Sequence, residues 1–138
     1  MEPKNPKDLQ GFKRVSYTKL PAVGVLCGSL AMMDGAGKYG PYNWRIEGKE
    51  ILATQYIDAC KRHLDAWVEG EEKAPDSKVH HLGHAIACLC MILDAQSGGF
   101  LQDDRPKPNP AFHKLLAEFN DFLKEKAEKA EKGPDLGR

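Results

Sequence analysis

Apolar residues recur at three- and four-residue steps in four stretches of the chain, the spacing of one face of an α-helix. The helices that this pattern predicts cover residues 21 to about 34, 49–69, 78–96 and 111–129. Pro21 fits the first turn of the first helix, and Gly35 and Gly37 predict its end. No stretch predicts a strand. The pattern therefore predicts an all-α fold, a compact bundle of about four helices with a glycine and aromatic loop between the first two.

The segments outside these helices give the expected domain organisation. Residues 1–20 are polar with two early prolines, which predicts a flexible N-terminal arm. Residues 21–132 are expected to form one helical domain, whose last part is a charged helical tail. Residues 133–138 predict a disordered tail.

The third predicted helix is apolar all round from His84 to Leu93, so it should lie at the centre of the bundle. It looks too hydrophobic for a lone four-helix packing, and we therefore expect a homo-oligomer. Gly24 and Gly28 weaken the first helix unless they allow another helix to approach closely. The connector at 71–77 is short enough to make its two neighbouring helices antiparallel.

Composition narrows the class of partner. Twenty Lys and Arg balance twenty Asp and Glu, which argues against a bulk nucleic-acid binder. No apolar run is long enough for a membrane span, and the N-terminal sequence resembles no secretory signal, so we expect a cytoplasmic protein that binds no membrane. The four cysteines form no Cys-x-x-Cys pair and are expected to be buried small hydrophobes in a reducing compartment.

The loop between the first two helices carries the best ligand signal. Its candidate binding residues are Lys38, Tyr39, Tyr42, Asn43, Trp44 and Arg45. The rings offer stacking surfaces and the cations offer phosphate donors, which indicates a flat anionic ligand such as a nucleotide. Arg62 on the next helix could reach the same cleft. The alternative is a structural plug, in which the rings pack over helix ends.

Three histidines lie on predicted core faces. His81 and His84 are neighbours on one face of the third helix, and His63 lies on the inner stripe of the second. Such imidazoles either find hydrogen-bond partners inside the core or hold a metal. The candidate carboxylate ligands are Glu69, Glu71, Asp76 and Asp94. The spacing matches no metal or nucleotide-binding motif.

Three blocks of this sequence together resemble a known family. They are Gly37-Lys38-Tyr39-Gly40 with Asn43-Trp44-Arg45, then Arg62-His63-Leu64 with Trp67 and Gly70-Glu71, then His81-Leu82 with His84-Ala85. Over about residues 20 to 96 the chain resembles the phage-borne dATP/dGTP diphosphohydrolase N-terminal domain family.

This resemblance implies an all-α domain similar to the MazG-type enzymes, which use Mg²⁺ to cleave a nucleoside triphosphate to its monophosphate and pyrophosphate. It implies a purine nucleotide as partner, with phosphates at Lys38, Arg45 and Arg62, and the host cytoplasm as location if the gene is phage-borne. His63, His81 and His84 become the candidate catalytic residues. The metal ligands would be His81, His84, Glu71 and Asp94. Imidazoles stand where MazG enzymes carry acidic pairs, so Mn²⁺ or Zn²⁺ would suit this site better than Mg²⁺.

Two other functions stay open. A non-catalytic protein that sequesters a nucleotide, or a nucleotide-derived signal of host defence, needs the cationic and aromatic loop but no metal. A helical adaptor whose histidines and tryptophans all lie in the core needs neither.

Overall fold

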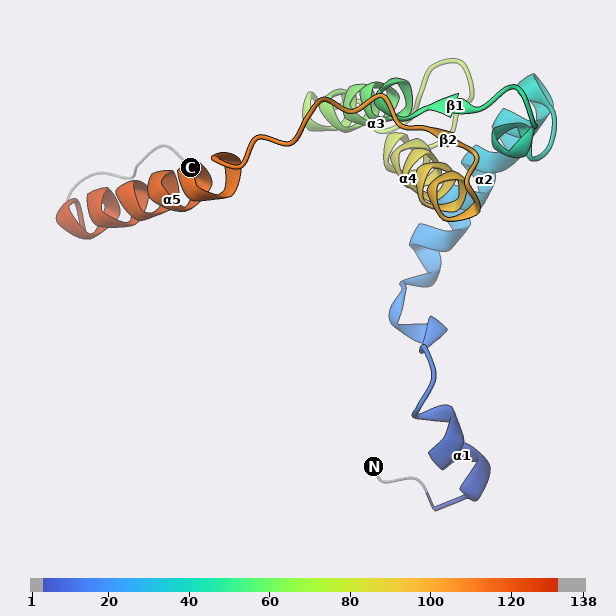
Figure 1. The fold of residues 1–138 in the computed structure, drawn as a ribbon, viewed down its shortest axis with the longest axis horizontal. Coiled ribbons are helices and arrows are strands. Elements are labelled where there is room, and N and C mark those ends of the chain that lie inside the picture. The colour runs from blue at the N-terminus through green and yellow to red at the C-terminus, as the bar shows by residue number, and fades with distance from the viewer. Residues whose placement is uncertain (1–3, 132–138) are drawn as a thin grey trace. The chain divides into compact units, whose positions relative to one another are not determined.

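The computed structural model describes residues 4–131, which are mostly helical (Figure 1). The elements are α1 (Pro6–Gly11), the 3₁₀ helix η1 (Tyr17–Lys19), α2 (Ala22–Tyr39), the 3₁₀ helix η2 (Asn43–Arg45), β1 (Ile51–Leu52), α3 (Ala53–Val68), α4 (His81–Gly98), β2 (Leu101–Gln102) and α5 (Phe112–Lys129). The chain divides into two compact units, one ending at Arg105 and one beginning at Pro106. The predicted all-α class is confirmed.

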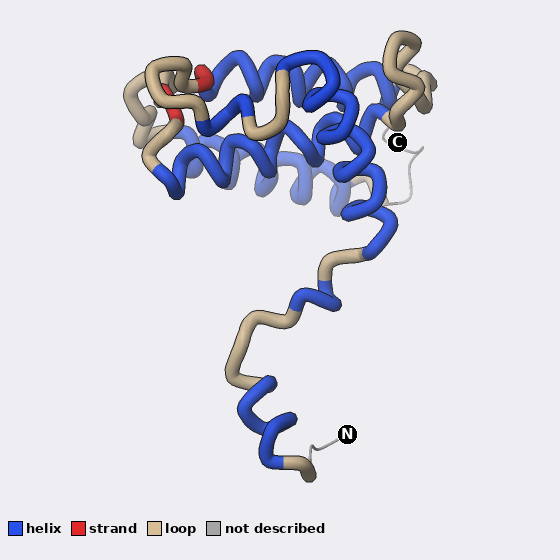
Figure 2. Tube along the Cα trace, turned by 90° about the vertical axis from the view of Figure 1, so that its right-hand side faces the viewer, coloured by secondary structure: helices blue, strands red, loops and turns tan. Residues whose placement is uncertain are grey.

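Helix α4 is the central element of the first unit, because it packs against both α2 and α3 (Figures 1 and 2). Small residues set the distance between α2 and α4. A Cβ placed on Gly83 would lie 2.6 Å from the carbonyl oxygen of Cys27, and one on Gly28 would lie 2.8 Å from Cγ2 of Ile86. The expected close approach at the glycines of the first helix is thus confirmed at Gly28.

The core of this unit is made of small side chains. One cluster centres on Ala31, Val79 and Ala87, and another on Cys60, Ala85 and Cys88. Among residues 4–131 no large side chain is fully buried. The expectation that all four cysteines are buried is wrong for Cys90, which is exposed, and Cys27 is only partly buried.

Helix α2 continues past the two glycines that were expected to end it. Lys38 forms an ion pair with Asp34 one turn earlier, at 3.0 Å, which supports the last turns. The helix ends at Tyr39, and Gly40 follows with a φ of 87°. The amide of Gly40 donates to the carbonyl of Ala36. The helix therefore ends just before Gly40, because its positive φ is a conformation that residues with a side chain rarely adopt.

A short parallel sheet corrects the prediction that the chain has no strand. Ile51 pairs with Leu101, and Leu52 with Gln102. This pairing holds residues 51 and 52 extended, so α3 begins at Ala53 and not at the predicted position 49. Two-residue strands lie below the length at which an alternating pattern can be seen.

The start of α4 also differs from the prediction, by three residues. Lys78 has a φ of 63°, and the side chain of His80 accepts a hydrogen bond from the amide of Leu82 at 3.0 Å. His80 therefore caps the helix. Asp76 and Ser77, which precede this helix and are also common capping residue types, instead bind Lys38 and His84.

The remaining described segments are simple. The arm contains α1, and the side chain of Asn5 caps this helix by accepting from the amide of Lys7 at 2.9 Å. The described residues of the arm, 4–20, are exposed. In the second unit α5 lies within one residue of its predicted bounds. A single domain over 21–132 stays a prediction, and the predicted tail at 133–138 lies outside the described residues. Within residues 4–131, no helix combines the length and apolar character that crossing a membrane requires.

Candidate functional site

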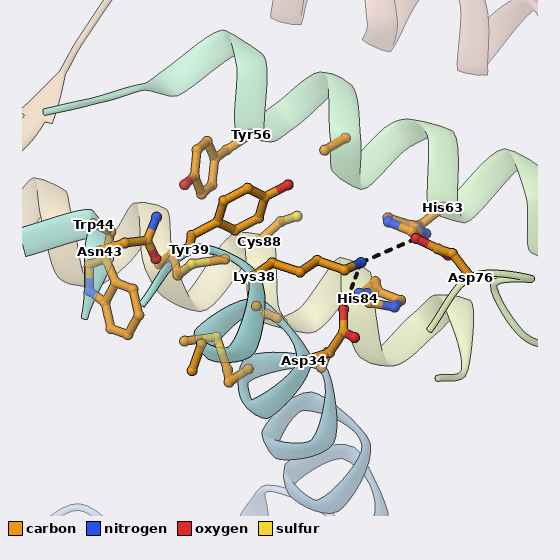
Figure 3. Close-up of a pocket in the computed structure, with 17 residues that line it drawn as sticks. Asp34, Lys38, Tyr39, Asn43, Trp44, Tyr56, His63, Asp76, His84 and Cys88 are labelled. Carbon is orange, nitrogen blue, oxygen red and sulfur yellow. Dashed lines mark hydrogen bonds and ion pairs between the residues drawn. The ribbon is translucent and has the colours of Figure 1, made fainter. Parts of the chain in front are cut away.

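A pocket of about 300 Å³ opens beside the central helix (Figure 3). Side chains from α2, η2, α3, α4 and the connector before α4 form its wall. Figure 3 shows the rings of Tyr39, Tyr56 and Trp44 toward one end and the imidazoles of His63 and His84 toward the other. The pocket therefore joins the two features that the sequence singled out, the aromatic loop and the histidine pair.

The three histidines lie together. The rings of His63 and His84 stack with centroids 4.5 Å apart and planes 13° apart. Nδ1 of His63 lies 2.8 Å from Nδ1 of His81. Nε2 of His81 donates to Glu71 Oε1 at 2.6 Å, so in a neutral His81 Nδ1 is the acceptor and His63 must donate to it. His81 is 5% exposed and does not line the pocket, so it orients His63 from behind.

Two of these imidazoles are biased toward their neutral form. Burial lowers the pKa of His84, and the nearby Asp34 and Asp76 offset only part of this. Burial also lowers the pKa of His63, helped by the adjacent imidazoles of His84 and His81. Nε2 of His84 lies 2.7 Å from the hydroxyl of Ser77. At neutral pH this end of the pocket therefore offers uncharged imidazoles with fixed hydrogen bonds.

An ammonium group held between two carboxylates borders the histidine end (Figure 3). Nζ of Lys38 lies 3.0 Å from Asp34 and 3.2 Å from Asp76. Hydrogen bonds to Asp34 and then to Asp76 raise the pKa of Lys38, and the bond from Lys38 lowers the pKa of Asp76. The predicted phosphate donor Lys38 does line the pocket, but two acidic partners already neutralise it.

The aromatic loop divides between the pocket and the surface. Asn43, Trp44 and Tyr39 line the pocket, whereas Tyr42 is 65% exposed outside it, with its ring centroid 5.7 Å from that of Trp44. Tyr42 has a φ of 57°, so the backbone turns there in the left-handed region. The loop is thus neither wholly a ligand surface nor wholly a plug.

Asp94 anchors this loop to α4. It accepts hydrogen bonds from Trp44 Nε1 at 2.7 Å and from Arg45 Nε and Nη2 at 2.7 and 2.8 Å. The Arg45 bonds, followed by the Trp44 bond, lower the pKa of Asp94 to about 2. Arg45 therefore braces the loop and does not line the pocket. Arg62, the third predicted phosphate donor, is exposed on α3 and does not line it either.

Two residues that line the pocket, Tyr56 and Asp34, were not among the residues that the sequence singled out, and Asp76 was considered there as a carboxylate for a metal. Tyr56 lies one and two turns before Cys60 and His63 on the same stripe of α3, a signal that could have placed it near the histidines. Burial raises the pKa of its hydroxyl. The sequence carried no signal for the pairing of Asp34 and Asp76, since they meet only through Lys38.

The proposed metal ligands do not come together. Glu71 contacts His81, whereas Asp94 lies roughly 20 Å further along α4 at 1.5 Å per residue and binds Trp44 and Arg45. Within the described range, 4–131, no three His, Cys, Asp or Glu side chains are grouped so that they could hold a metal ion. The four predicted ligands therefore cannot serve one ion in this arrangement. The donors present also do not fit Mg²⁺, because the two pocket carboxylates both bind an ammonium group.

Comparison with known proteins gives one family. No curated protein and no solved structure matches the chain. A family model described as dATP/dGTP diphosphohydrolase, N-terminal, matches residues 4–105, which include the arm, the three packed helices and every residue that lines the pocket. Phage origin and likeness to MazG enzymes stay predictions. The chain belongs to the dATP/dGTP diphosphohydrolase N-terminal family.

Proposed function

We propose that this chain is a nucleotide-handling domain that binds purine deoxynucleoside triphosphates in the pocket beside α4. The observation that carries the proposal is the pocket itself, with three aromatic rings and one amide side chain converging in a member of a purine nucleotide hydrolase family. Concave sites with apolar walls and a few fixed polar groups are the usual form of a small-molecule site.

The ring end of the pocket suits a base. Tyr39, Tyr56 and Trp44 supply flat apolar faces, on which any purine can stack. The amide of Asn43 offers both a donor and an acceptor to the edge of the base. The pairing of Trp44 with Asp94 fixes the indole without using its face. These groups recognise a purine without choosing between adenine and guanine.

Binding is tested by calorimetric titration of dATP and dGTP into the full chain. We expect both to bind, and the Asn43→Ala variant to bind about three- to tenfold more weakly, the effect of one lost hydrogen bond. Asn120→Ala, on α5 and outside the pocket, is the matched control and should bind as the parent does. If neither triphosphate binds, the proposed function is wrong.

Hydrolysis by this chain is the stronger form of the proposal. Water would attack the α-phosphorus, pyrophosphate would leave, and a neutral imidazole of His63 or His84 would take the proton from the water. His81 would position His63. The predicted divalent metal, Mg²⁺, Mn²⁺ or Zn²⁺, is tested in the same assay by adding each ion to the chain with dATP or dGTP. Pyrophosphate above the metal-only blank, lost in His84→Gln and kept in His113→Gln, supports catalysis.

The rival is a non-catalytic nucleotide binder, and one observation favours it. The carboxylates of the pocket bind Lys38, and within residues 4–131 no three His, Cys, Asp or Glu side chains are arranged so that they could hold a metal ion. If the affinity for dATP and dGTP is unchanged by EDTA and no pyrophosphate forms with any of the three metals, the chain is a non-catalytic nucleotide binder. The oligomeric state and the cytoplasmic location stay predictions of the sequence.

A further inference from the structure

The one positive group that lines the pocket is already paired with two negative groups. Lys38 is the one cation among the residues that line it, and it donates to the carboxylates of Asp34 and Asp76. An ammonium group has three N–H donors, so two of them are already used. Any phosphate that approached the third would also face two carboxylates within a few ångströms. The lining therefore carries one more negative than positive group.

The histidines do not reverse this balance. The pKa values of His63 and His84 are lowered, mainly by burial, so both rings are neutral at pH 7. The burial that raises the pKa of Cys88 to about 11 keeps this neighbouring thiol uncharged as well. No titration near neutral pH supplies a positive charge for a phosphate chain.

The other predicted phosphate donors do not compensate. Arg45 lies outside the lining and forms a two-point pair with Asp94. Arg62 is exposed on α3 and does not line the pocket. A site built for a triphosphate normally presents several free donors or a metal ion to the phosphate oxygens.

Most of the groups that line the pocket are, by contrast, uncharged. Three aromatic rings, the Asn43 amide and the thioethers of Met32 and Met91 surround the space. A volume of about 300 Å³ is at the lower end of the range for small-molecule sites, about 300–1,000 Å³. Size and polarity both suit a ring system with few or no charges.

From this distribution we infer that the pocket takes the uncharged base and sugar of a purine nucleotide and that the phosphate groups stay outside it. This inference rests on the proposed function, since it concerns the same ligand class and the same pocket. It has a chemical consequence. The inference therefore agrees with the binding form of the proposed function and excludes its hydrolytic form, because His63 and His84 would contact the nucleoside and could not act as the base at the α-phosphorus.

Calorimetry with a series of ligands tests the inference on the full chain in EDTA. The probes are deoxyadenosine, deoxyguanosine, dATP, dGTP and inorganic tripolyphosphate, each at 50 and 300 mM NaCl. We expect each nucleoside to bind within about threefold of its triphosphate, tripolyphosphate to give no binding, and affinity to change less than about threefold with salt. Contacts to free cations would instead make the affinity fall steeply with salt.

Each other outcome has a defined meaning. Triphosphates that bind more than tenfold tighter than the nucleosides, or tripolyphosphate that competes with them, overturn the inference and leave the proposed function intact. If no purine compound binds, the proposed function fails and the inference fails with it.

A charge variant provides a second, independent test. Asp76→Asn removes one of the two carboxylates from Lys38, and Asp76 is exposed enough that the fold should tolerate the change. We expect dATP to bind several-fold tighter and deoxyadenosine to bind within twofold of the parent. Asp65→Asn, an exposed residue of α3 outside the pocket, makes the same change in net charge and should alter neither. An Asp76→Asn variant with unchanged or weaker dATP binding overturns the inference.

Discussion

At the scale of single residues, Asp94 does the most to shape the site. One carboxylate on α4 accepts hydrogen bonds from the indole of Trp44 and the guanidinium of Arg45. Trp44 and Arg45 lie some fifty positions before Asp94 in the chain, so these bonds join two distant segments, the loop and α4. The position of one wall of the pocket therefore depends on this residue.

Replacing Asp94 tests whether the position of this wall depends on it. We expect Asp94→Asn to lower the melting temperature by a few degrees and to change the Trp fluorescence, because the loop loses a charged acceptor. Asp103→Asn is the matched control. The pKa of Asp103 is also lowered to about 2, but by Arg105 two residues away, so its pair joins no distant segments. An equal loss of stability in both variants would contradict the tethering role.

The carboxylate of Asp94 also predicts that the stability of the fold depends on pH in the acid range. Its folded-state pKa of about 2 lies below its ordinary 3.8, so its contribution to stability is complete above about pH 4 and is lost as the pH falls toward 2. The difference in melting temperature between the parent and Asp94→Asn should be constant from pH 5 to 8 and shrink below pH 4. Thermal melts across this range, followed by circular dichroism, measure it.

The histidine pair predicts a second pH window. The pKa values of His63 and His84 are lower in the folded chain than the unfolded value of about 6.5, so the unfolded state binds more protons just below that pH. Stability should therefore fall as the pH drops from 7 to 5. We expect a decrease of several degrees in melting temperature in the parent and a smaller one in His63→Gln or His84→Gln. His113→Gln, on the exposed surface of α5, should behave as the parent.

At the scale of elements, the contact of α4 with α2 depends on residues without side chains. Gly83 meets the backbone of Cys27, which cannot move without displacing α2, whereas Gly28 meets the side chain of Ile86. A Cβ placed on Gly24 would lie 3.7 Å from Cδ1 of Ile86, an ordinary contact distance. The three glycines thus form a graded series along one interface.

Alanine at each of them gives a graded prediction. Gly83→Ala should lower the free energy of unfolding by about 1–3 kcal/mol, because a clash with backbone forces the helices apart. Gly24→Ala should raise it by up to about 1 kcal/mol through helix propensity. Gly28→Ala should fall between them, because Ile86 can shift. Urea denaturation measures all three, with Gly35→Ala as the control in open space within α2. A Gly83→Ala chain with the same free energy of unfolding as the parent would contradict this packing.

The helices could be predicted because periodicity is a local property. The bounds of α5 and the end of α3 just before Gly70, which has a φ of 98°, follow from neighbouring residues alone. The ends that failed depend on distant partners. Ile51 and Leu52 are extended only because residues 101 and 102 lie beside them, and Gly35 stays helical beside the pair of Asp34 and Lys38.

The same difference between local signals and distant partners explains how much of the site could be predicted. The aromatic loop and the histidines could be found from residue type, and the structure places both at one pocket. Their partners could not be found, because Lys38 meets Asp76 across thirty-eight positions and Asp94 meets Trp44 across fifty. These pairings turned two expected phosphate donors into neutralised groups, and they separated Asp94 from the histidines with which it was grouped.

At the scale of the whole molecule, the buried core of the described residues consists mainly of alanines and cysteines, while many large apolar side chains are exposed. On α2 the face opposite α4 carries Leu26, Leu30 and Met33, which are 69%, 50% and 69% exposed. Their spacing of four and three residues places them in one stripe. The stripe lies within the segment that the family model matches, so it belongs to the family domain itself.

This stripe supports the expected homo-oligomer, with a second copy of the chain as the occupant of the stripe. Light scattering after size exclusion should give a multiple of the 15.3 kDa chain mass. Leu26→Glu combined with Leu30→Glu should return the mass to 15.3 kDa with the helical circular dichroism retained, because neither side chain is needed for the contact with α4. Val68→Glu, which is 73% exposed on α3, adds a like charge away from the stripe and should leave the oligomer intact. A parent chain that elutes at 15.3 kDa at high concentration would refute self-association, and the stripe would then have to be covered by another protein or another part of a longer chain.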